Sequence, residues 1–97
     1  MKSEVSNTEK ILAAAILIER MLEAVAVDFS LEVKPGRGPR SVVDQLSQHE
    51  LITKEELQAF RDFWSIRNKI VHGGMEPTDE ITARILDLGW RLVRVFA

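Results

Sequence analysis

Hydrophobic residues recur along this chain at the three- and four-residue intervals that one face of an α-helix requires. Nowhere do Val, Ile and Thr alternate with polar residues as they do in a half-buried strand. In the first predicted helix, five apolar residues share one face: Ile11, Ile18, Leu22, Val25 and Phe29. The pattern predicts an all-α protein with helices over about 7–29, 41–48, 54–72 and 79–96.

Capping and turn residues mark the ends of these predicted helices. Thr53 and Glu56 have the spacing of a capping box, which opens the third helix. Gly73 and Gly74 close it, because glycine readily takes the left-handed conformation found at helix C-termini. Residues 34–40 contain two prolines and two glycines, and we expect them to form a loop.

At 97 residues the chain has the length of one small domain, spanning residues 1–97. We expect a four-helix up-and-down bundle. The last helix carries two apolar stripes, one formed by Ile81, Ile85, Leu88 and Leu92, and another by Leu86, Trp90 and Val93. Such an excess fits either helices that are central in a tight bundle or a homodimer interface. Leu12, Ile16 and Trp90 are the residues through which we expect a partner to dock.

The third predicted helix places charged and polar residues on an apolar face. Arg67 lies in the middle of its apolar stripe, where a charge is costly unless it is paired. Asn68 and His72 are four residues apart, so their side chains can hydrogen-bond. Arg67 and His72 are five apart, roughly 140° around the helix axis, so one helix does not present both to a small target. A second copy, related by a two-fold axis, can present to the target the residue that the first copy directs away from it.

These residues resemble a motif of a known superfamily. The string Arg67-Asn68-Lys69-Ile70-Val71-His72 is similar to the R-x4-6-H motif of the HEPN superfamily (higher eukaryotes and prokaryotes nucleotide-binding domain). The polar residue after the arginine and the place of the motif near the end of a late helix match as well. The resemblance covers about residues 11–95 and is closest to short, appended-domain forms that lack one helix.

The resemblance implies a bundle that dimerises through the motif-bearing face. In catalytic members the paired motifs form a metal-independent endoribonuclease site. By this resemblance His72 acts as general base or acid, Arg67 holds the scissile phosphate, and Asn68 orients one of them. It also implies RNA or nucleotide binding and, in a toxin–antitoxin setting, an antitoxin as protein partner.

A second interpretation needs no chemistry. Arg67 can form a structural ion pair with Glu19 or Glu23 of the first helix, and His72 can cap the helix end. The chain is then a non-catalytic dimerisation or partner-docking module. The two interpretations share the dimer.

The net charge of −2 does not attract nucleic acid to the molecule as a whole, so contact with RNA needs a local patch. Basic residues near the motif and in the predicted loop are the candidates for weak nucleic-acid contacts: Lys69, Arg61, Arg37 and Arg40. The alternative for the loop arginines is a solvated surface. Trp64 and Trp90 are expected in the core rather than as stacking platforms for bases.

The amino-acid composition and the length of the apolar runs argue against several kinds of site and segment. The chain has no cysteine, and its two histidines have no metal-ligand spacing, so we expect neither a metal nor a cofactor. Its longest apolar run is residues 11–18, far below the roughly 20 residues that cross a bilayer. The first ten residues are polar and do not resemble a signal peptide. These features predict a cytoplasmic location.

Overall fold

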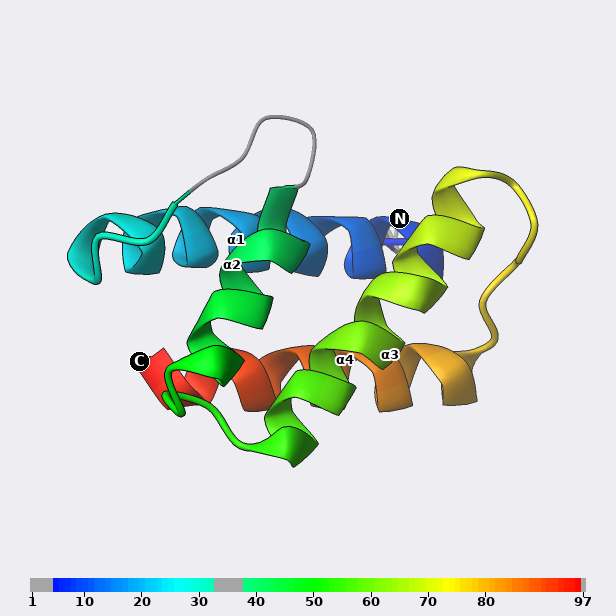
Figure 1. Cartoon of the computed structure of the whole chain (residues 1–97). Coiled ribbons are helices and arrows are strands. Elements are labelled where there is room, and N and C mark those ends of the chain that lie inside the picture. Colours follow the sequence, from blue (N-terminus) through cyan, green and yellow to red (C-terminus); the bar gives the residue numbers. More distant parts are fainter. Residues whose placement is uncertain (1–4, 33–37, 97) are drawn as a thin grey trace.

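The computed structural model of this protein describes residues 5–32 and 38–96. Within these ranges the chain forms four α-helices and no strand (Figure 1). The helices are α1 (Asn7–Asp28), α2 (Gly38–Gln48), α3 (Lys54–Val71) and α4 (Asp79–Phe96). The predicted all-α class with four helices is confirmed.

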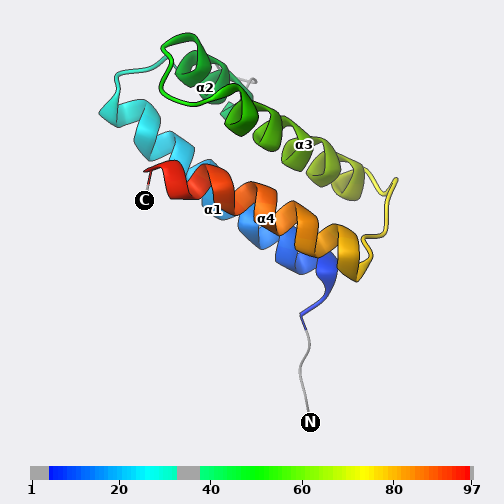
Figure 2. The same cartoon turned by 90° about the horizontal axis from the view of Figure 1, so that it is seen from below.

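The three long helices alternate in direction, and the short one lies across them. Both views show α1 and α4 running the same way, while α3 runs in the opposite direction in Figure 2 and slants across α4 in Figure 1. The Asn7 amide joins the starts of α1 and α4 by donating to the Pro77 carbonyl oxygen at 3.3 Å and to Asp79 Oδ1 at 2.8 Å. Helix α2 crosses α1 steeply and packs on α1 and α3. The arrangement therefore departs from a simple up-and-down order at α2.

Helix α2 corrects the predicted boundary of the loop. It begins at Gly38, three residues before the predicted start at residue 41. Pro39 therefore lies in the first turn, where helices tolerate proline because the missing N–H has no intrahelical partner there. The earlier part of the predicted loop, up to Arg37, lies outside the described residues.

The buried core draws on all four helices. Its largest fully buried side chains are Phe63, Ile11, Ile18, Leu22, Leu46, Leu92 and Val43. Phe29 departs from the predicted face of α1, because it caps the end of the helix and is 47% exposed. At Gly89 an added Cβ would lie 3.0 Å from Phe63 Cε2 and 3.1 Å from Ile18 Cδ1, so a residue without a side chain lets α4 approach both neighbours.

Several apolar side chains remain on the surface. Ile16 is 51% exposed and Trp90 is 37% exposed, while Leu12 is partly buried against the core. Trp90 therefore departs from the expectation of a core aromatic. In the second predicted stripe of α4, Leu86 and Val93 are also only partly buried.

Across residues 5–32 and 38–96, none of the helices has the length and apolar character needed to span a membrane.

Candidate functional site

Arg67 lies at the interface of α3 with α1 and makes three contacts. Its Nη1 donates a 3.0 Å hydrogen bond to Asn68 Oδ1, and its Nη2 lies 3.8 Å from Glu19 Oε1 on α1. Its guanidinium carbon stands 4.7 Å from the centroid of the Trp64 ring, within range of a cation–π interaction. The chain thus selects Glu19, of the two acids predicted, as the partner of the arginine.

These contacts do not use the full donor capacity of Arg67. A guanidinium has five N–H donors, and the Nε of Arg67 is buried with no acceptor among the described residues. The Glu19 contact is also long, since charge-assisted N–H···O bonds are usually about 2.7–2.9 Å. The Arg67 side chain keeps 28% of its surface exposed, so an additional anion can approach it.

Trp64 is enclosed on both faces of its ring. Phe60, one turn earlier on α3, stacks on it with centroids 5.5 Å apart and an interplanar angle of 15°. Arg67 lies about one turn later and covers the other face. With only 8% of its surface exposed, Trp64 belongs to the core as predicted.

Asn68 pairs with the residue beside it rather than with the histidine one turn on. The predicted Asn68–His72 side-chain hydrogen bond is absent, although both residues are described. Asn68 Oδ1 instead accepts from Arg67, and the backbone N–H of His72 donates to the Asn68 carbonyl oxygen at 3.0 Å. A hydrogen bond from a charged guanidinium is stronger than one between neutral groups, which favours the contact with Arg67.

His72 is the exposed C-cap of α3. The glycines after it close the helix in a Schellman motif: the Gly73 N–H donates to Ile70 O at 3.0 Å, and the Gly74 N–H donates to Lys69 O at 2.8 Å. Gly73 has φ +71°, the left-handed conformation that glycine takes without strain. The imidazole is therefore held at the end of a well-terminated helix and faces solvent.

The predicted nucleic-acid contacts that lie within the described residues are all exposed. Arg61 lies 3.7 Å from Asp44 Oδ1 of α2 in an exposed ion pair. Lys69 is exposed on α3. Arg40 is exposed in the first turn of α2, and Arg37 lies outside the described residues.

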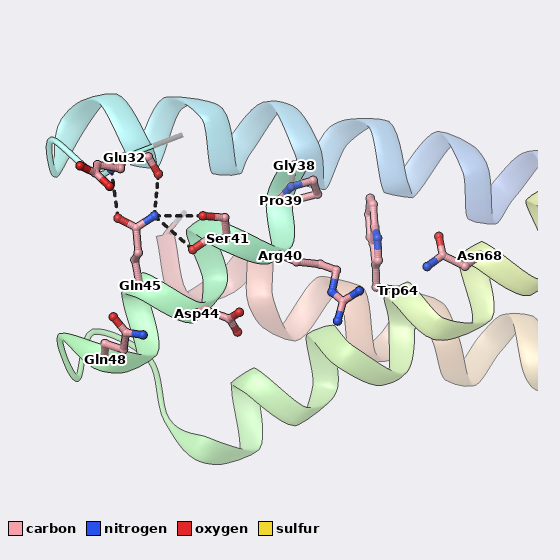
Figure 3. Close-up of a pocket in the computed structure, with 10 residues that line it drawn as sticks. All are labelled: Glu32, Gly38, Pro39, Arg40, Ser41, Asp44, Gln45, Gln48, Trp64 and Asn68. Carbon is pink, nitrogen blue, oxygen red and sulfur yellow. Dashed lines mark hydrogen bonds between the residues drawn. The ribbon is translucent and has the colours of Figure 1, made fainter. Parts of the chain in front are cut away.

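A polar pocket of about 790 Å³ opens between α2 and α3. Trp64 and Asn68 line it from α3, and Arg40, Asp44 and Gln45 line it from α2 (Figure 3). Asn68 therefore touches both the Arg67 cluster and the pocket.

The sequence did not predict this pocket or the clamp that shapes it. Gln45 accepts from the Glu32 N–H at 3.0 Å and donates to the Glu32 carbonyl oxygen at 2.6 Å, which ties the segment after α1 to α2 (Figure 3). A glutamine at an ordinary helical position carries no signal of such a tie, because its partner is thirteen residues away and main-chain.

In the described part of the chain, no group of three or more His, Cys, Asp or Glu side chains is placed to hold a metal ion. Comparisons of the chain with protein-family models, with curated proteins and with solved structures found no match.

Proposed function

We propose that this protein is a HEPN-like, RNA-directed domain that works as a homodimer and cleaves RNA without a metal. Arg67, Asn68 and His72 form its site, with Arg67 on the scissile phosphate and His72 as acid or base. The observation that carries the proposal is the joined pair of Arg67 and Asn68, partly exposed beside a polar pocket, with a solvent-facing histidine one turn further along.

RNA supplies the nucleophile for this chemistry. The 2′-oxygen attacks the adjacent phosphorus, and the bond from phosphorus to the 5′-oxygen of the next nucleotide breaks. The products end in a 2′,3′-cyclic phosphate and a 5′-hydroxyl. The His72 imidazole either takes the proton of the 2′-hydroxyl as base or donates a proton to the leaving oxygen as acid, and water carries the other proton.

A second copy of the chain completes this site. Five residues on one helix separate Arg67 and His72 by roughly 140° and about 7.5 Å along the axis, so they diverge. A two-fold dimer brings the Arg67 of one copy toward the His72 of the other and so forms two equivalent sites, each with one guanidinium and one imidazole. Exposed apolar side chains, Ile16 and Val71 among them at 51% and 49% exposure, supply surface for such an interface.

The test is incubation of single-stranded RNA with the purified protein in EDTA, followed by analysis of the product ends. We expect cyclic phosphate termini, with light scattering showing a dimer. A folded monomer that neither binds nor cleaves RNA contradicts the proposal.

A second function is favoured by the Glu19 ion pair. In this alternative the chain is a dimerisation or partner-docking module, and Arg67 only joins α3 to α1. Ile16→Asp tests it together with the RNA assay. A variant that becomes monomeric while the parent protein leaves RNA intact supports the docking module. RNA cleavage that depends on His72 rules it out.

A further inference from the structure

We infer that the pocket between α2 and α3 holds one nucleotide of the RNA strand, next to the phosphate that reaches Arg67. The inference rests on the proposed function and names the part of its substrate that the Arg67 cluster does not touch. The volume of the pocket, about 790 Å³, falls within the range of small-molecule sites, roughly 300–1,000 Å³.

The wall of the pocket on the α2 side is fixed before any ligand arrives. Gln45 forms the two bonds to Glu32 through its amide oxygen and nitrogen. Its Nε2 also lies 3.2 Å from the Ser41 carbonyl oxygen and 3.3 Å from Ser41 Oγ. These contacts hold α2 against the segment that follows α1 (Figure 3). A wall that is already ordered loses little conformational entropy on binding, which favours a specific ligand.

The pocket presents hydrogen-bond donors beside two carboxylates, those of Glu32 and Asp44. Arg40 forms no ion pair among the described residues, and its guanidinium extends from α2 toward Trp64 (Figure 3). The Trp64 indole N–H donates to no acceptor in the described part of the chain, and Trp64 lines the pocket. The Asn68 amide nitrogen remains available, since only its oxygen is used by Arg67. Phosphate and base carbonyl oxygens are the acceptors that such donors suit.

The pocket also has an acceptor on the same α2 wall. Asp44 lines it with a half-exposed carboxylate that can accept from a ribose hydroxyl or a base amino group. An arginine with a nearby carboxylate favours a ligand that carries both an anion and hydroxyl or amino donors. A nucleotide has this combination.

The enclosed indole decides how the base is recognised. Because Phe60 and Arg67 cover the two faces of Trp64, a base does not stack on it. The indole N–H is then the group through which Trp64 can recognise the base, by donating to a base carbonyl oxygen. Asn68 then links the two parts of the site, since its oxygen holds Arg67 while its nitrogen faces the neighbouring nucleotide.

Uridine 5′-monophosphate is the probe for this pocket, and the indole N–H signals of the 15N-labelled protein are the readout. The chain has two tryptophans, so Trp90→Phe assigns the signals and the Trp90 indole serves as internal control. We expect the Trp64 signal to move with saturation while the Trp90 signal stays in place. Arg40→Ala should weaken binding about tenfold, whereas Arg84→Ala, which removes an exposed arginine of α4, should leave it unchanged.

The outcomes separate this inference from the proposed function. A Trp64 signal that ignores the nucleotide, in a protein that cleaves RNA through His72, overturns the pocket and leaves the nuclease. Equal weakening by Arg40→Ala and Arg84→Ala also overturns the pocket. A Trp64 signal that responds, in a protein that neither binds nor cleaves an RNA strand, overturns the proposed function and leaves a nucleotide site.

Discussion

The ends of α2 and α3 have the same local structure and differ in the turn that precedes them. Each helix is followed by a histidine, His49 or His72, and then by a residue with a left-handed backbone, Glu50 at φ 57° or Gly73 at φ 71°. In both, the two backbone N–H groups after the histidine return to carbonyl oxygens of the last turn. Both histidines are exposed.

The charged residues five positions before the two histidines have opposite sign. An amide stands four residues earlier in both helices, Gln45 in α2 and Asn68 in α3. Five residues earlier α2 has Asp44, whereas α3 has Arg67. A guanidinium binds a phosphate through paired, charge-assisted hydrogen bonds, which a carboxylate at the corresponding position does not offer. An exposed histidine at a helix end therefore does not define a site by itself, and the charged residue five positions before it distinguishes the two helix ends.

The largest expected difference lies in catalysis by the two histidines. His72→Ala should lower the rate of RNA cleavage by about 100-fold or more, because general acid–base catalysis contributes roughly 10²–10⁴-fold. His49→Ala removes the same side chain from the same kind of helix end and should leave the rate unchanged. Cleavage rates on one labelled RNA, with circular dichroism to check folding, measure both. Equal losses would show that the histidines act only through the fold.

The two charged residues should differ next, in stability. Arg67→Ala removes the contacts to Glu19, Asn68 and Trp64 and should cost about 2 kcal/mol, because bonds to charged groups and cation–π contacts are each worth about 0.5–3 kcal/mol.

In a domain of this size that cost lowers the melting temperature by roughly 10 °C. Asp44→Ala breaks only the exposed pair with Arg61 and should change stability by less than about 0.5 kcal/mol. Thermal unfolding measures both variants. An unchanged melting temperature for Arg67→Ala contradicts the packing described for α3.

The smallest effects should come from the left-handed residues, with opposite signs. Gly73→Ala places a Cβ at φ +71° and should destabilise the fold by about 1 kcal/mol. Glu50→Gly relieves the same strain at φ 57° and should stabilise it by roughly 0.5–1 kcal/mol. Urea unfolding at constant temperature resolves changes of this size. Shifts of the same sign would mean that the two helix ends are not equivalent.

The sequence predicted the features that depend on local patterns. Helical periodicity located four helices, and the capping box predicted at Thr53 and Glu56 forms with both of its hydrogen bonds. Gly73 and Gly74 end α3 as their conformational freedom suggested. Each of these signals lies within a few residues of the structure it specifies.

Features that depend on distant residues were predicted less completely. Helical periodicity places two acids of α1, Glu19 and Glu23, near the edge of its apolar face as candidate partners of Arg67. Only the packing of α3 against α1 shows that Glu19 is the partner. The early start of α2 was missed, because proline and glycine in sequence signal loops as readily as first turns. The pocket arises where α2 crosses toward α3, and a crossing angle leaves no mark in residue spacing.

The most direct test of a site shared between two copies of the chain is complementation between two inactive variants. Arg67→Gln and His72→Ala proteins are assayed for RNA cleavage separately and after joint unfolding and refolding, with light scattering to confirm dimers. If one site takes Arg67 from one copy and His72 from the other, each variant alone is inactive. The mixture then regains roughly a quarter of the parent activity, because half of the dimers are mixed and each carries one intact site of two. A mixture that forms dimers but stays as inactive as its components contradicts the shared site.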